Sequence, residues 1–137
     1  MNEREILEAL QGAVRDHAVP ESIAPTLPVK YVGRTLEVPN DQKYLELIWV
    51  PSNRNGDYWG GEKNHQGLFR MVLHWPNDNL GAYTPIDVIE SIGSYFTKDC
   101  LAPDIVLLET PDFRGPLEMG HETLYPSQLR YQSYRSA

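Results

Sequence analysis

The first apolar positions of the chain recur with helical spacing. They are Ile6, Leu7, Leu10 and Val14. Residues three and four apart share one face of a helix, so the pattern predicts an amphipathic helix. Asn2 is a favourable capping residue at its start. We expect the helix to end near His17, before Pro20, because proline lacks the N–H group that a helix needs.

Alternation of apolar and polar positions then predicts strands. Residues 43–50 place Leu45, Leu47 and Trp49 on one face, as the two-residue period of a strand requires. Residues 67–75 place Phe69, Met71, Leu73 and Trp75 on one face, and Arg70 and His74 on the other. A weaker strand is expected within residues 29–36, interrupted by Gly33. Strands that follow one another usually pair, so 43–50 and 67–75 are expected to form an antiparallel hairpin.

A second helix and two further strands follow. Thr84, Pro85 and Asp87 are typical of a helix start, and the expected buried stripe is Ile86, Ile89, Ile92 and Phe96. Residues 105–108 predict a buried strand, 110–122 a loop rich in Pro and Gly, and 124–134 a last strand. We therefore expect one α+β domain spanning 1–137, with an N-terminal helix and one central helix on one face of a mainly antiparallel sheet of about four to five strands.

The connection between the hairpin strands, residues 51–66, is the most informative segment for function. It is far longer than the two to five residues of an ordinary hairpin loop, and as an extended arm it would reach ~25 Å. Aromatic and arginine side chains commonly anchor protein interfaces. We therefore predict interface contacts by Asn53, Arg54, Tyr58 and Trp59. The alternative is that Tyr58 and Trp59 fold back onto the core of their own domain.

The C-terminal segment gives a second interface prediction. Its Tyr and Arg content, including Arg130 and Tyr134, is typical of a contact surface. An edge strand whose arginines extend along apolar surface would look the same. Both interpretations stay open from the sequence.

Composition narrows the classes of partner. A formal net charge of −7 argues against sequence-specific nucleic-acid binding, which needs clustered Lys and Arg. The single cysteine allows no internal disulfide and no cysteine-based zinc cluster. No apolar run approaches the ~20 residues of a membrane span, and the charged start has no apolar signal core. We expect a protein made in a cytoplasm that does not contact membranes.

No motif for catalysis or for cofactor binding is present. The segment 56–63 only resembles a phosphate loop, because Glu62 precedes Lys63 where glycine is needed. The histidines His65, His74 and His121, with Asp57 or Asp78, are the only metal-ligand set worth weighing. None has the spacing that makes a ligand pair from sequence. We expect no enzyme activity, no cofactor and no metal.

The succession of segments resembles the tail-terminator (tail-completion) proteins of long-tailed bacteriophages along nearly the whole chain. The matching features are an N-terminal helix at 5–10, a strand entered after Pro39 through 44–47, a Gly-led strand at 67–76 followed by Gly81, an Asp-bearing helix from Asp87 to Phe96, and strands at 105–108 and 129–131. The chain departs from that pattern in the long polar segment 51–66 and in the Pro- and Gly-rich segment 110–122.

The resemblance implies a structural virion protein located in the phage tail after assembly in the host cytoplasm. It would form a homo-oligomeric ring, a hexamer, that caps the tail tube, ends polymerisation of the tail tube protein and joins the head-completion or neck proteins. DNA would pass through its lumen. The alternatives are a head–tail adaptor or other small neck protein, a metal- or ligand-binding α+β domain, and a host interaction module recognised through Tyr58 and Trp59.

Overall fold

The computed structural model describes residues 3–15, 28–37, 43–54, 63–77, 83–96, 105–108 and 111–135. It contains two helices and seven strands. In chain order they are α1 (Glu3–Ala13), β1 (Val29–Lys30), β2 (Tyr44–Arg54), β3 (Lys63–Pro76), α2 (Tyr83–Ser94), β4 (Ile105–Leu107), β5 (Asp112–Phe113), β6 (Leu117–Met119) and β7 (Glu122–Arg135).

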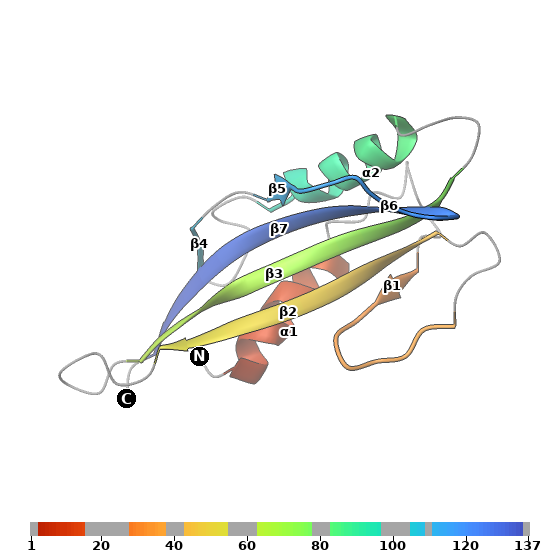
Figure 1. Ribbon diagram of the computed structural model, residues 1–137. Helices are drawn as coiled ribbons and strands as arrows, with labels where there is room; N and C mark the ends of the chain where they lie inside the picture. Colours follow the sequence, from red (N-terminus) through yellow and green to blue (C-terminus); the bar gives the residue numbers. More distant parts are fainter. Residues whose placement is uncertain are drawn as a thin grey trace.

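All the strands belong to one sheet, ordered β1-β2-β3-β7-β4, with β5 and β6 also paired to β7 (Figure 1). The β1–β2 pair is parallel. The other pairs are antiparallel. The expected α+β class and mainly antiparallel sheet are confirmed. Five strands form the main path, and two short strands add to it.

The β2–β3 hairpin is longer than the alternation pattern predicted. Its ladder continues to the pair Arg54↔Asn64, so the strands include residues 51–54 and 63–66, which we had assigned to the connection. The connection predicted at 51–66 therefore covers only 55–62, which lie outside the described residues. The strand β7 explains this extension, because it pairs with β3 along the whole of Lys63–Pro76 and so holds the polar end of β3 in the sheet.

The segment predicted as a loop at 110–122 instead contains β5, β6 and the start of β7. Together β4, β5 and β6 follow one edge of β7 in succession. Phe113 pairs with Ser127, and Leu117 pairs with Leu124. The edge segment therefore advances by four residues where β7 advances by three. The extra residue makes a bulge at Gly115 and Pro116, as expected where proline interrupts a ladder.

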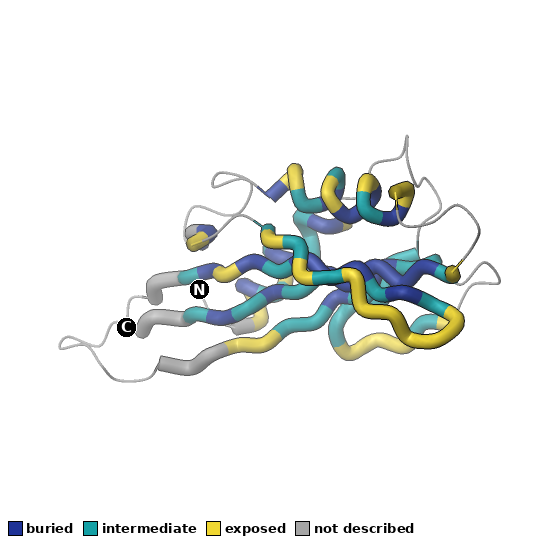
Figure 2. The backbone as a smooth tube through the Cα atoms, turned by 45° about the horizontal axis from the view of Figure 1, so that its top comes forward, coloured by how far each residue is buried: buried dark blue, intermediate teal, exposed yellow. Residues whose placement is uncertain are grey.

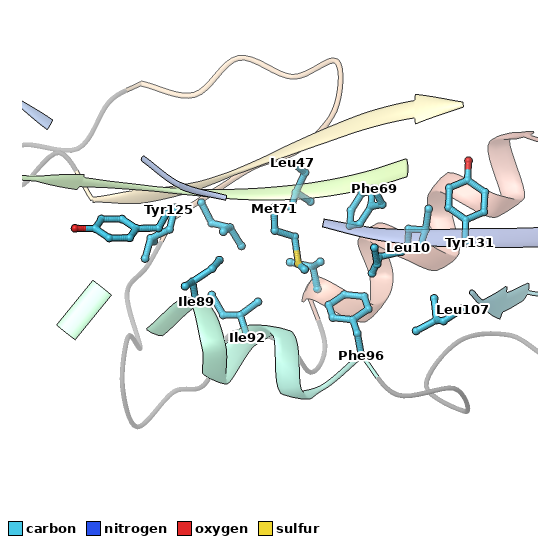
Figure 3. Packing of buried hydrophobic residues seen from close by; sticks show 14 of the residues in the cluster. Leu10, Leu47, Phe69, Met71, Ile89, Ile92, Phe96, Leu107, Tyr125 and Tyr131 are labelled. Atoms are coloured by element: carbon cyan, nitrogen blue, oxygen red, sulfur yellow. The ribbon is translucent and has the colours of Figure 1, made fainter. Parts of the chain in front are cut away.

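Both helices pack on the same face of the sheet, as predicted (Figure 3). One hydrophobic cluster joins Ile6, Leu10 and Val14 of the N-terminal segment to Val88, Ile89 and Ile92 of α2 and to the inward positions of β2, β3 and β7, which include Leu45, Leu47, Phe69, Met71, Leu73, Leu129 and Tyr131. The predicted alternation of the two central strands is therefore confirmed. Ile86 is only partly buried, and Val88 takes its place in the buried stripe of α2.

The N-terminal elements differ from the expectation where they are described. The helix predicted to reach His17 is regular only to Ala13, and His17 lies outside the described residues. The strand predicted within 29–36 is reduced to Val29 and Lys30, since the chain turns at Gly33, whose φ is 78°. Glycine adopts this positive φ without the steric cost that other residues meet.

Candidate interaction surfaces

Two of the predicted interface segments meet at one end of the sheet. The ladders place Arg54 of β2, Asn64 of β3 and Tyr134 of β7 in one cross-strand row. Asn53 lies in the adjacent row, opposite His65. The backbones of two segments that are far apart in the sequence therefore meet where β2, β3 and β7 end together (Figure 1).

The remaining predicted interface residues are placed differently. Arg130 lies on β7, opposite Leu68, and its side chain is exposed. This side chain points away from the helices, because the buried Leu129 and Tyr131 on either side of it face the core. Tyr58 and Trp59 lie outside the described residues. Neither their predicted interface role nor the alternative core contact is tested.

The sheet face opposite the helices, which we call the outer face, carries a shallow groove of about 400 Å³. Its lining combines apolar side chains with charged ones: Glu46, Ile48, Arg70, Val72, Arg114, Leu117, Leu124, Pro126 and Gln128. Figure 2 shows buried and intermediate positions along the central strands, and exposed positions along β6. The outer face is thus partly apolar, unlike a plain solvent-exposed sheet surface.

A group of polar side chains surrounds His74 on the outer face. The His74 ring stacks on Tyr44, with ring centroids 4.1 Å apart. Its Nε2 lies 3.0 Å from Oε1 of Glu46, and its Nδ1 lies 3.5 Å from Oε1 of Glu122. The second carboxylate oxygen of Glu46 accepts a hydrogen bond from Nζ of Lys30, at 3.3 Å.

This arrangement changes the proton affinity of two neighbours of His74. Burial raises the pKa of Glu46, but the hydrogen bonds and the charge interactions with His74 and Lys30 together outweigh burial, so the pKa is lowered. The pKa of Tyr44 is raised, chiefly by burial and further by the carboxylates of Glu122 and Glu46. Glu46 therefore stays ionised and ties β1, β2 and β3 together on the outer face.

Only His74 and His121 of the metal-binding set that the sequence raised as an alternative have described side chains. Within the described part of the chain, no three His, Cys, Asp or Glu residues are arranged to hold a metal ion. His74 is buried against its carboxylate partners, whereas His121 is exposed in the turn before β7. The side chain of His65, and Asp57 and Asp78, lie outside the described structure.

Sequence reasoning placed His74 on the polar face of its strand but missed its partners. Strand alternation assigns Glu46 and His74 to the same face as soon as the β2–β3 pairing is known. The missing information was the register, since a shift of one residue would move Glu46 to the core side. The groove was also missed, because it depends on β6, which was predicted as loop.

None of the described helices is long and apolar enough to span a bilayer. No known protein family and no curated protein matches the chain. Several solved structures share its fold, among them the following two. One, of a protein whose name states no function, has a TM-score of 0.79 and 18% identity over 97% of this chain and 96% of its own. The other belongs to the virion of a native gene transfer agent particle, with a TM-score of 0.60 and 14% identity over 95% of both chains.

Proposed function

We propose that the chain is a structural component of a phage-like particle, in which it acts as a tail terminator. The observation that carries this proposal is the fold shared, over 95% of both chains, with a component of a gene transfer agent virion. A likeness that extends over nearly all of both chains supports a common role as an assembly unit. The segment-by-segment resemblance to tail-completion proteins supports the finer assignment.

In this role the chain forms a closed homo-oligomeric ring, a hexamer, on the end of the tail tube. Identical subunits close such a ring through head-to-tail contacts between two different surfaces of each copy. One side of the ring contacts the tail tube protein, and the other contacts head-completion or neck proteins. The net charge of −7 is compatible with a lumen through which DNA moves without binding, since like charges repel.

The direct test is a polymerisation assay with the tail tube protein of the same particle. Purified chain is added while tubes grow, and tube length is measured by negative-stain electron microscopy. A terminator shortens the tubes in proportion to its concentration and is found at one end only. Tubes of unchanged length, with the protein absent from their ends, contradict the proposal.

The same assay separates a terminator from a head–tail adaptor. An adaptor binds isolated head connectors and leaves tube polymerisation unaffected. Binding to connectors without any effect on tube length therefore moves the chain from the tail end to the neck of the particle.

A further inference from the structure

Two surface patches, one beside β1 and one on α2, carry opposite charge. At the β1 side of the sheet, a cavity of about 460 Å³ lies between α1 and the segment that follows β1. We call it the basic corner, and its lining residues are Glu8, Gln11, Gly12, Arg15, Tyr31 and Arg34. At the other side, α2 packs against β7 and β5 (Figure 1). This helix has a stripe of exposed residues.

The basic corner is a preformed feature. Oε1 of Gln11 accepts a hydrogen bond from the backbone N–H of Val32 at 2.8 Å, which fixes α1 against the turn after β1. The Arg34 guanidinium lies 6.0 Å from the centre of the Tyr31 ring. Glu8, the only carboxylate in the lining, forms an ion pair with Arg4 at 2.9 Å. Arg15 and Arg34 supply the positive charges of the lining.

The stripe on α2 is acidic. Tyr83, Asp87, Glu90 and Ser94 are all exposed and are spaced by four, three and four residues, which places them on one face of the helix. We call this stripe the acidic helix face. The helix contains no Lys or Arg. Within the described structure, neither Asp87 nor Glu90 forms an ion pair, and Tyr83 is 84% exposed.

On the side of the basic corner, the described part of the chain leaves most of the β2 edge uncovered. The short strand β1 covers this edge of β2 only at Leu45 and Glu46. No described strand covers residues 47–54 on that side. Proteins usually protect a long unpaired edge, and a neighbouring chain is one way to cover it.

We propose that these two patches are the head-to-tail contact of the ring, in which the acidic helix face of one copy docks into the basic corner of the next. This inference rests on the proposed function, which requires a heterologous contact, and it names the two surfaces that make it. Glu90 and Asp87 of one copy meet Arg34 and Arg15 of the neighbour. Tyr83 adds an amphipathic side chain of the kind enriched at interfaces.

The contact is tested by charge exchange. Ring formation is followed by mass photometry over a concentration series for the wild type and for Arg34→Glu, Glu90→Lys and the double variant. Each single variant places like charges at the contact and raises the concentration needed for rings by about tenfold or more. The double variant restores the opposite charges and returns that concentration toward the wild-type value.

The matched control is the double variant Arg34→Glu/Glu118→Lys. It has the same total charge as Arg34→Glu/Glu90→Lys, but Glu118 is an exposed residue of β6, outside the acidic helix face. This control must not restore the rings. Equal rescue by both double variants shows an effect of net charge and overturns the inference, as does a wild-type ring that neither single change weakens.

The outcome is separable from the proposed function. A wild-type chain that caps tail tubes, while its rings ignore the charge changes, contradicts this contact and leaves the terminator role intact. A chain that forms rings with the expected charge dependence but never affects tube length supports the contact and contradicts the terminator role.

Discussion

Gly67 lies in the middle of β3, where the ring of Tyr131 crosses the strand. A Cβ at this position would lie 2.6 Å from the Tyr131 hydroxyl and 2.8 Å from the backbone oxygen of Val50. The same hydroxyl accepts a hydrogen bond of 2.7 Å from Nε1 of Trp49. Position 67 therefore has to be glycine, because the Tyr131 side chain of β7 passes over β3 at this point to reach Trp49 of β2.

We predict that Gly67→Ala lowers the free energy of unfolding by about 2 kcal/mol, because the buried ring must shift to admit the methyl group. Urea denaturation measures the loss. Gly12→Ala in α1 is the matched control, since its Cβ would meet only the Arg15 side chain at 3.6 Å. This change should raise stability by about 0.5 to 1 kcal/mol. Equal effects of the two changes would contradict this explanation.

Glu46 gives a prediction about pH at the same scale. Its pKa in the folded chain lies below the ordinary value of 4.5, so its stabilising contribution is complete above 4.5. The contribution is lost as the pH falls through the lower, folded-state pKa. Denaturation of the wild type and Glu46→Gln over a pH series should show the difference in unfolding free energy shrinking in acid. The exposed Glu118→Gln variant should show no such trend, and a pH-independent difference for Glu46→Gln would be the contrary result.

At the scale of the elements, the sequence predicted what local periodicity controls. The inward positions of β2 and β3, such as Leu47 and Met71, were correct because alternation is visible within each strand. Residues 51–54 and 63–66 were missed because they are polar and are ordered by a ladder with the distant β7. The strands β5 and β6 were missed because proline and glycine normally mark loops, whereas here they mark a bulge in an edge. The His74–Glu46 contact could not be predicted without the register.

The hairpin allows a sharp test of the predicted interface at Tyr58 and Trp59. Replacing residues 56–62 by Asn-Gly places a two-residue turn between residue 55 and Lys63, which keeps the register Arg54↔Asn64. We predict that the variant folds with unchanged thermal stability but no longer shortens tail tubes. A double Tyr58→Ala/Trp59→Ala variant checks the aromatic contribution with the backbone intact. Normal capping by both variants would remove this segment from the mechanism.

At the scale of the whole molecule, one sheet face is buried under two helices and the other carries a partly apolar groove. The two sides of the molecule differ in the charge of their surface patches and in strand pairing. Among the described strands, β1 covers only Leu45 and Glu46 of the β2 edge on one side, and β4, β5 and β6 follow the β7 edge on the other. This asymmetry is what a subunit needs in order to meet identical neighbours through two different surfaces. Composition alone gave the net charge but could not place it on either side.

The proposed tail-terminator ring is tested most directly by two measurements on the same samples. Mass photometry of the purified chain over a concentration series measures ring formation, and negative-stain imaging after mixing with tail tubes shows where the rings bind. We predict closed rings of one uniform size and a single ring at one end of each tube. A chain that stays monomeric at every concentration and leaves both tube ends bare would contradict this prediction.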